Sequence, residues 1–397
     1  MDTSKMRRLP KMSSGKSHEL LAIGPESSRV AVRSAGLFED TGLRHQLVEI
    51  IEALYDLGRV QKVYEIFGGF VNRSFGLVVQ RDGIRKAYLL RQYKHGVAEN
   101  EIKFEHALIN YCTARGFSIV AGVIANRQGT TYFKPTQSKS FFAVYEYLEG
   151  EDKYSWNNPA LNDEEFVSAS KMLATFHTAT IGFDPGNFRR VEPPIIDLLP
   201  TFRSAFQTHA QTARNSKFQR FFLTHLENIM ESIGNTRITE ADVSGMPLCP
   251  IHCDFHPGNL KYKNNRVVGI FDFDWSKIDL RLFDVGMAIN YFCGSWDETS
   301  DGDLRLEKAT LFLNTYQDQL YQTDGMKPLN AVEIENLPGM LTAANLCIIN
   351  WIVTTFHSDD KLIDDDYLAY LKHTVRLMYS IAKHRRTIAQ IAAGLLK

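Results

Sequence analysis

A segment in the second half of the chain carries the side chains that metal-dependent phosphate chemistry requires. Asp254 and Asn259 lie five residues apart, and the Pro257-Gly258 pair between them predicts a turn rather than a helix. Their carboxylate and amide groups can therefore converge on one point. Thirteen residues after Asn259, Asp272 ends an apolar stretch with strand character. Carboxylate and amide oxygens suit Mg²⁺, which also takes substrate phosphates as ligands, so the spacing predicts a magnesium site.

The same stretch also contains side chains that can bind zinc, namely Cys249, His252, Cys253 and His256. Structural zinc sites typically draw their ligands from two separated clusters, and the sequence has no second Cys/His cluster. Asp and Asn in a turn can also serve only to cap backbone N–H groups. The joint spacing of the two Asp and the Asn favours magnesium over both alternatives.

The part of the chain before this segment has a β-rich pattern. Short apolar stretches alternate with turn dipeptides, of which Asp82-Gly83 is an example. The predicted order is a helix at 44–55, strands at 63–67, 74–79 and 87–93, a helix at 99–113 and a strand at 141–147. Residues 41–148 are thus predicted to form an N-terminal β-rich lobe, and residues 1–40 a flexible tail.

Beyond residue 150 the pattern becomes helical. Asn162 followed three residues later by Glu165 is typical of a capping box at the start of a helix. A strand is predicted at 267–273, after the Asn264-Asn265 turn. Residues 149–397 are therefore predicted to form a larger, mainly α lobe, and a ligand site is expected in the cleft between the lobes.

The composition excludes several classes of protein. A length of 397 residues suits two lobes, and the formal net charge of −1 gives no sign of a nucleic-acid partner. Five cysteines spread over the chain do not resemble a secreted disulfide framework and favour a reducing compartment. We find no apolar run typical of a membrane span or a signal peptide. The expectation is a soluble cytoplasmic protein without nucleic-acid or membrane partners, whose oligomeric state the sequence does not predict.

The loop at 252–259 reads His-Cys-Asp-Phe-His-Pro-Gly-Asn. With the hairpin that ends at Asp272, it resembles the catalytic loop and metal-binding strand of the aminoglycoside phosphotransferase and choline kinase-like superfamily. That family's loop usually reads His-Gly-Asp-x-His-x-x-Asn, and this chain departs from it only at Cys253. The resemblance implies an α+β, protein kinase-like fold of two lobes. It also implies that Asp254 is the catalytic base, and that Asn259 and Asp272 hold the Mg²⁺ ions that bridge the ATP phosphates.

Several neighbouring residues have predicted supporting roles. His252 is expected to support the loop through hydrogen bonds, whereas His256 could line the site. Asp274 is interpreted as a solvated carboxylate. Asp284, in a segment similar to the family's Tyr-Asp-Leu-Ala, is interpreted as the N-cap of the next helix, with a structural role. His177, in a Leu-Ala-x-x-His pattern, is expected to be a packing residue.

The N-terminal lobe carries the features that the family uses to bind ATP. Gly68, Gly69 and Asn72 match the Gly-Gly-x-x-Asn turn that covers the phosphates, since adjacent glycines let backbone N–H groups approach an anion. Arg91 stands at the place of the kinase third-strand lysine, and Glu105 matches its carboxylate partner. Arg can bind phosphate or carboxylate with two nitrogens, so the pair could still orient ATP. A solvated Arg beside an unrelated Glu is the alternative.

Glu146, Tyr147 and Leu148 resemble the family's hinge, whose backbone usually bonds the adenine. Taken together, the resemblance covers residues 60–290 and implies transfer of the ATP γ-phosphate to a hydroxyl of a small molecule. The acceptor classes are an amino alcohol, an amino acid, a sugar or an aminoglycoside-like antibiotic. Homoserine, choline, ethanolamine, amino sugars, methylthioribose and hydroxylysine all remain open as acceptors.

Two other functions are compatible with the sequence. Arg91 and Cys253, the departures from the family pattern, motivate a nucleotide-binding pseudokinase with a scaffolding role. A Ser/Thr protein kinase is the second alternative, although the sequence shows no Ala-Pro-Glu signature after Asp272.

Overall fold

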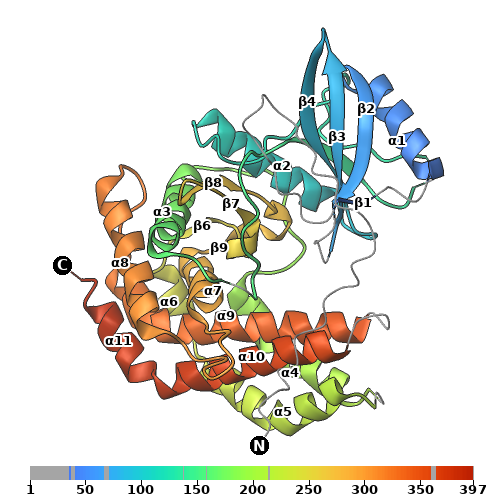
Figure 1. Ribbon diagram of the computed structural model, residues 1–397. Coiled ribbons are helices and arrows are strands. Elements are labelled where there is room, and N and C mark those ends of the chain that lie inside the picture. The colour runs from blue at the N-terminus through green and yellow to red at the C-terminus, as the bar shows by residue number, and fades with distance from the viewer. Residues whose placement is uncertain are drawn as a thin grey trace, which may run out of the picture.

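The computed structural model of the chain describes residues 35–36, 41–66, 71–136, 138–157, 159–212, 215–358 and 364–396. Its first part is a five-stranded antiparallel sheet in the order β1-β2-β3-β4-β5, accompanied by two helices (Figure 1). The strands are β1 (Ala35–Gly36), β2 (Arg59–Ile66), β3 (Arg73–Arg81), β4 (Ile84–Gln92) and β5 (Phe142–Glu146), and the helices are α1 (Thr41–Leu54) and α2 (Glu99–Ala114). Apart from β1, the predicted tail lies outside the described residues.

Local sequence explains the central hairpin of this sheet. Asp82 and Gly83 adopt φ angles of 50° and 80°, the left-handed values that a tight two-residue hairpin turn between β3 and β4 needs. On β3, Phe75 and Leu77 alternate toward the interior, where they join a buried cluster with Leu47 of α1. The first part of the chain therefore has its own small core.

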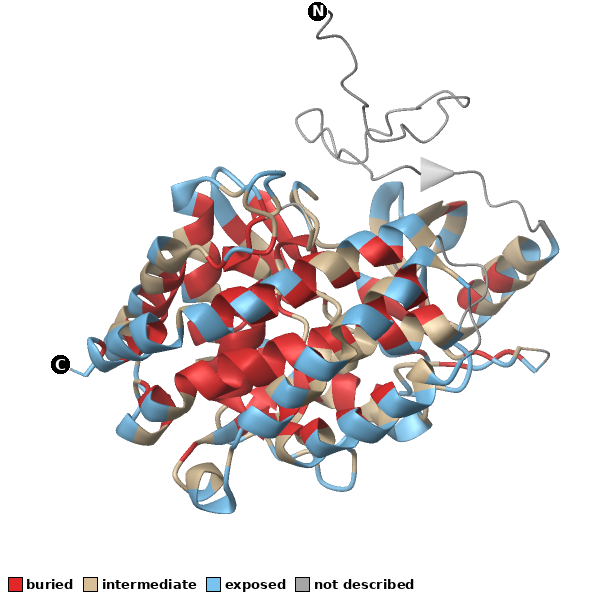
Figure 2. Ribbon diagram, turned by 90° about the horizontal axis from the view of Figure 1, so that it is seen from below, coloured by how far each residue is buried: buried red, intermediate tan, exposed pale blue. Residues whose placement is uncertain are grey.

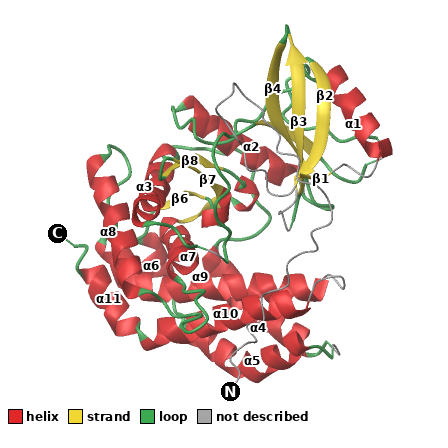
Figure 3. Ribbon diagram, in the orientation of Figure 1, coloured by secondary structure: helices red, strands yellow, loops and turns green. Residues whose placement is uncertain are grey.

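The second part is mostly helical, with two small two-stranded sheets set into it (Figure 3). Its helices are α3 (Asp163–Ala179), α4 (Ile195–Ala210), α5 (Lys217–Asn235), α6 (Glu240–Ser244), α7 (Arg281–Cys293), α8 (Leu306–Gln322), α9 (Ala331–Ser358), α10 (Asp364–Lys383) and α11 (Arg385–Ala393). The strand pairs are β6 (Leu248–Ile251) with β9 (Lys277–Leu280), and β7 (Leu260–Lys263) with β8 (Arg266–Ile270).

Two predicted local signals act as expected. Asn162 Oδ1 accepts a hydrogen bond from Glu165 N at 2.9 Å, and Glu165 Oε2 accepts one from Asn162 N, which completes the capping box of α3. Asn264 and Asn265 have φ angles of 52° and 60° and turn β7 into β8. The predicted strand at 267–273 is thus present as β8, and the acidic residues lie just beyond its end.

The long helix α9 is the core of the helical part. It is long and apolar enough to cross a membrane by length and composition alone, yet 72% of that apolar window is buried inside the protein. Helices α4, α7, α10 and α11 pack against it. In Figure 2 the buried residues (red) lie on the inward faces of the helices, while the exposed residues lie on their outer faces. The contacts of α9 with these four helices account for the apolar sequence of α9.

The arrangement confirms the predicted fold class, an antiparallel sheet followed by a larger, mainly α part. The chemistry-bearing loops lie where the two parts meet. Helix α2 contacts the short 3₁₀ turn η2 (Phe273–Trp275) that follows β8.

Candidate active site

Asp254 and Asn259 do converge. The chain leaves β6 after Ile251, and a 3₁₀ turn, η1 (Pro257–Asn259), brings the amide back toward the carboxylate. Asn259 Nδ2 donates to Asp254 Oδ2 at 3.0 Å and to the Asp254 carbonyl at 2.9 Å. Because the amide nitrogen faces Asp254, the side-chain oxygen of Asn259 remains available to a cation.

The backbone of this loop is held by Asp284, and the predicted N-cap role of that residue is wrong. Helix α7 begins three residues earlier, at Arg281, so Asp284 lies inside its first turn. Its two carboxylate oxygens accept hydrogen bonds from the backbone N–H groups of His252 at 2.9 Å and Cys253 at 2.8 Å. The expected structural role is thus supported, but the carboxylate fixes the loop rather than the helix end.

Asp284 is itself fixed by other buried groups. His177 Nε2 lies 3.0 Å from Asp284 Oδ2, and His177 Nδ1 lies 2.7 Å from the Tyr316 hydroxyl. Although burial opposes the charge of Asp284, the hydrogen bonds from His177 and the loop backbone keep its pKa below the ordinary value. His177 is therefore buried, as expected of a packing residue, and also hydrogen-bonded to the loop's anchor.

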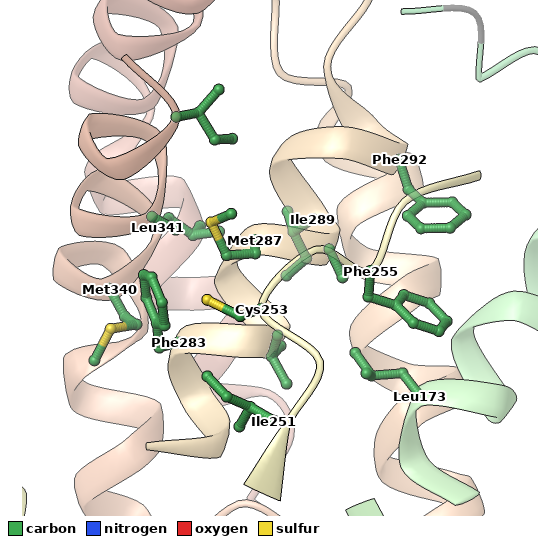
Figure 4. Packing of buried hydrophobic residues seen from close by; sticks show 14 of the residues in the cluster. Leu173, Ile251, Cys253, Phe255, Phe283, Met287, Ile289, Phe292, Met340 and Leu341 are labelled. Carbon is green, nitrogen blue, oxygen red and sulfur yellow. The ribbon is translucent and has the colours of Figure 1, made fainter. Parts of the chain in front are cut away.

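Cys253, the position where the chain departs from the family, has a left-handed backbone with φ of 64°. Glycine adopts this conformation without steric cost, which explains why a glycine is usual here. The thiol instead packs among buried apolar side chains, including Ile251, Phe283 and Leu341 (Figure 4). The substitution is accommodated inward, so it does not place a side chain over Asp254.

Arg91 joins the two parts of the protein. Its Nη1 donates to Glu105 Oε1 at 3.2 Å, and its Nη2 lies 2.9 Å from Asp272 Oδ1. The Arg91 and Glu105 side chains are 7% and 3% exposed, so this pair is not the solvated alternative. The structure therefore places the predicted arginine–glutamate pair against the predicted metal ligand.

Asp272 and Asp274 form a second acidic group in the site, which we call the acidic pair. Asp274 is not the solvated carboxylate that the sequence suggested, because Asn72 Nδ2 donates to its Oδ2 at 2.7 Å. Burial and the neighbouring charge of Asp272 raise the pKa of Asp274 well above its ordinary range. Asp274 Oδ1 is buried and accepts no hydrogen bond from the described residues, whereas Asp272 Oδ1 is paired with Arg91 Nη2 at 2.9 Å. Two adjacent carboxylates, one of which has an oxygen without a hydrogen bond, fit a divalent cation.

The predicted nucleotide-binding residues are only partly within the described ranges. Gly68 and Gly69 lie outside them. Asn72 is described, and besides its bond to Asp274 its Oδ1 accepts from Lys94 N at 3.0 Å. It therefore links the start of β3 to Asp274.

At the predicted hinge, Glu146 N donates to Gly122 O at 2.7 Å, so this N–H group is already used. In the described part of the chain, neither Tyr147 nor Leu148 has a backbone hydrogen bond outside the sheet. Their peptide groups are therefore the ones that could bind adenine.

The sequence did not indicate Arg190, which lies in the connection between α3 and α4. Its side chain is 9% exposed, donates to the Asp274 carbonyl and lies 3.6 Å from Glu101 Oε1 of α2. Its guanidinium carbon lies 4.4 Å from the ring centroid of Trp275. No motif marks this arginine, since its partners are far away in the sequence.

A group of half-buried aromatic side chains beside Asp254 was also not predicted. Tyr291 of α7 donates to Asp254 Oδ1 at 3.3 Å. Burial and the charge of Asp254 raise the pKa of Tyr291, so its hydroxyl keeps the donated proton. The ring centroid of Trp156 lies 6.3 Å from the ring centroid of Tyr291, 5.4 Å from that of Trp296 and 4.4 Å from that of Tyr370. We call these four residues the aromatic cluster.

The structure does not gather the candidate zinc ligands, Cys249, His252, Cys253 and His256, into a metal site. Within the described ranges, no group of three or more His, Cys, Asp or Glu side chains could hold a metal ion. His252 Nε2 instead lies 3.0 Å from the Phe271 carbonyl, a supporting bond of the expected kind. His256 accepts from Gly258 N at 3.0 Å, and its Nε2 lies 3.5 Å from Asp254 Oδ2. His256 therefore borders the site.

Comparison with known proteins identifies this arrangement. The model of the phosphotransferase enzyme family (APH) matches residues 64–314, more than half of the chain. The chain belongs to this family. Among curated proteins, the homoserine kinase of Cupriavidus pinatubonensis is 25% identical over 296 residues, covering 74% of this chain and 80% of that protein. The homoserine kinase of Gluconobacter oxydans is 21% identical, with 84% and 95% covered.

Solved structures of phosphotransferases share the fold. A spectinomycin phosphotransferase in complex with ADP and spectinomycin has a TM-score of 0.59 at 13% identity, and covers 85% of this chain and 98% of its own. The choline kinase of Cryptosporidium parvum has a TM-score of 0.58 at 14% identity, with 89% and 100% covered. The family membership confirms the predicted activity class, phosphoryl transfer from ATP to a hydroxyl of a small molecule. It does not favour the pseudokinase or the protein kinase.

Proposed function

We propose that this phosphotransferase uses Mg²⁺ and ATP to phosphorylate the hydroxyl of a small amine-bearing acceptor, with Asp254 as the catalytic base. One observation carries the proposal. The Asp254 carboxylate lies between the candidate metal ligand Asn259 on one side and the aromatic cluster, through Tyr291, on the other. The hydroxyl of an acceptor bound next to the aromatic cluster would lie beside Asp254. It would then face the ATP phosphate bound with the metal ion on the Asn259 side.

Each residue has a defined part in this mechanism. Asp254 would orient the hydroxyl and accept its proton, while Tyr291 and Asn259 hold the carboxylate in place. Mg²⁺, when bound, neutralises charge on the ATP phosphates, and Asp272 and Asn259 would hold it, with Asp274 beside them. An amicoumacin kinase of the same fold was solved with AMP-PNP and Ca²⁺, which supports a divalent cation in this fold.

The nucleotide would lie along the sheet of the first part. The peptide groups of Tyr147 and Leu148 would bind adenine, and Arg91, anchored by Glu105, would contact the phosphates. Gly68, Gly69 and Asn72 are proposed to cover the phosphates from above, in the manner of the family's turn.

The surroundings of Asp254 support this acceptor class. Aromatic faces attract an ammonium group, and the aromatic cluster together with the Asp254 charge offers such an environment. The curated relatives named above are homoserine kinases. Homoserine is therefore the first acceptor to test, followed by amino alcohols and amino sugars. We place the enzyme in the cytoplasm, without a nucleic-acid or membrane partner.

The test is ATP consumption with Mg²⁺ over a panel of hydroxylated amino acids, amino alcohols and sugars. We expect turnover with an amine-bearing member of the panel. In Asp254→Asn, kcat should fall by about 10²- to 10⁴-fold, the usual contribution of a general base. Asp82→Asn, an exposed change in the β3–β4 turn, is the matched control and should leave kcat unchanged.

Turnover only with uncharged sugars would refute the amine-bearing acceptor. If Asp254→Asn retained kcat within about tenfold, Asp254 would not be the base.

A further inference from the structure

A buried network of hydrogen bonds lies behind Arg91, on the side away from Asp272. The four other members are Tyr93, directly after β4, Glu105 and His106 on α2, and Tyr145 on β5. All five side chains belong to residues that are at most 5% exposed. Burial of charged groups at this depth costs free energy of folding unless every one of them is paired and hydrogen-bonded. The presence of this network therefore calls for a functional explanation.

Both carboxylate oxygens of Glu105 accept hydrogen bonds. Its Oε1 accepts from Arg91 Nη1 at 3.2 Å and from the Tyr145 hydroxyl at 3.1 Å. Its Oε2 accepts from the Tyr93 hydroxyl at 2.8 Å. Burial raises the pKa of both tyrosines well above its usual range, so both hydroxyls keep their protons and act as donors.

His106 fixes the direction of these donors. Its Nε2 lies 2.9 Å from the Tyr93 hydroxyl and 3.0 Å from the Tyr145 hydroxyl. Its Nδ1 lies 2.7 Å from the Thr131 hydroxyl. The Tyr93 and Tyr145 hydroxyls also lie 2.5 Å apart, so each can donate either to Glu105 or to the other tyrosine. With both protons directed at Glu105, His106 carries its proton on Nε2 and accepts from Thr131 at Nδ1. Burial lowers the pKa of His106 to about 3, in keeping with this neutral form.

Tyr145 makes a second contact that suits arginine in particular. The guanidinium carbon of Arg91 lies 5.4 Å from the centroid of the Tyr145 ring. The planar guanidinium can therefore face an aromatic ring, reach Glu105 with one terminal nitrogen and reach Asp272 with the other. A lysine ammonium at this position would have one point of charge for all three partners.

We infer that Tyr93 and Tyr145 are positioning residues for ATP, which act by holding Glu105 and hence Arg91, and that this nucleotide site is built for arginine instead of lysine. The inference rests on the proposed function, because it assigns Arg91 to the phosphates. Of the three partners of the guanidinium, Asp272 is shared with the metal site. Glu105 and the Tyr145 ring are thus the contacts that fix Arg91 when a nucleotide is bound.

The experiment measures the Kd of the ATP analogue AMP-PNP with Mg²⁺ by calorimetry, which needs no acceptor, alongside the KM for ATP, kcat and the thermal midpoint. Tyr93→Phe and Tyr145→Phe each remove one donor to Glu105 but keep the ring. We expect each to raise Kd and KM about tenfold, which corresponds to about 1.4 kcal/mol, with a smaller change in kcat. Arg91→Lys should weaken binding at least as much.

Tyr55→Phe is the matched control. Tyr55 is 1% exposed, and its hydroxyl has no hydrogen-bond partner among the described residues. The same chemical change there should alter neither Kd nor KM. A merely structural role of the tyrosines would move the thermal midpoint and leave Kd at its original value.

A double-variant cycle tests the route through Arg91. In an Arg91→Met background, which keeps a long side chain without its charge, Tyr93→Phe should change Kd less than about twofold. An equal tenfold loss in both backgrounds would overturn the inference, as would full affinity in Arg91→Lys. Nucleotide binding without turnover of any acceptor would refute only the proposed acceptor chemistry, whereas no nucleotide binding by the unchanged protein would refute both.

Discussion

At the scale of single residues, Cys253 illustrates how a departure from a family motif can be tolerated. A non-glycine residue in the left-handed region costs about 1–2 kcal/mol. Here the backbone conformation of the loop is fixed, because Asp284 accepts hydrogen bonds from the N–H groups of both His252 and Cys253. The buried thiol regains part of that cost through its apolar contacts.

Substitutions at Cys253 should separate strain from packing. In Cys253→Gly, the relief of strain opposes the loss of buried side-chain contacts, so the free energy of unfolding should change by less than about 1 kcal/mol. In Cys253→Val, a β-branched residue must adopt a φ it rarely adopts, and we expect a loss of more than about 2 kcal/mol. Urea unfolding measures both values. Equal stability of the two variants would show that the loop can relax its backbone.

The residues that sequence could predict are those whose partners are near in the chain. Asp254 and Asn259 are separated by one turn, and their convergence follows from that turn. The role of Asp284 could not be predicted, because its hydrogen-bond partners lie about thirty residues earlier. A carboxylate near a helix start has the local signature of a cap, and only the tertiary structure shows which N–H groups it binds.

At the scale of elements, the α3–α4 connection ties the two parts of the protein together. Arg190 contacts the Asp274 carbonyl and lies near Glu101 of α2, and Val191 N donates to Glu101 Oε1 at 3.3 Å. The connection is itself held by Lys277, which donates to Glu192 and to the Pro193 carbonyl. This link fixes α2, which carries Glu105, relative to the acidic pair.

Removal of the Arg190 side chain should therefore affect the metal and nucleotide site. In Arg190→Ala we expect the Mg²⁺ concentration for half-maximal activity and the KM for ATP to rise about tenfold, the equivalent of one charged hydrogen bond. Arg189→Ala removes an exposed arginine one residue earlier and is the control. Arg190→Lys should restore part of the loss. The link would be unimportant for the site if Arg189→Ala and Arg190→Ala had the same kinetics.

Sequence reasoning gave the elements themselves more readily than their connections. Strands, turns and capping boxes depend on local residue types, which is why the β3–β4 turn and the capping box of α3 were predictable. The α3–α4 connection has no periodicity, and its arginine acts across a distance of 84 residues to Asp274. The aromatic cluster likewise gathers Trp156, Trp296 and Tyr370 from three separate segments.

At the scale of the whole molecule, the candidate site is shared by both parts. Arg91 comes from β4 and Asn72 from the residue before β3, whereas Asp272, Asp274 and Asn259 come from the helical part. The contacts from Arg91 to Asp272 and from Asn72 to Asp274 cross this boundary. A ligand that binds here should therefore stabilise both parts together.

Thermal unfolding with and without ligand tests that expectation. With Mg²⁺ and the non-hydrolysed analogue AMP-PNP at 100 times its Kd, the folded state should gain about 2.7 kcal/mol, and the unfolding transition should move upward as one step. Removal of Mg²⁺ with EDTA should cancel most of the gain, since the carboxylates of Asp272 and Asp274 would lose their cation. Asp272→Asn should show little gain at the same ligand concentration, whereas Asp82→Asn should behave like the unchanged protein. A transition that splits in two, with only one step moved by ligand, would mean that the contacts across the boundary do not couple the two parts.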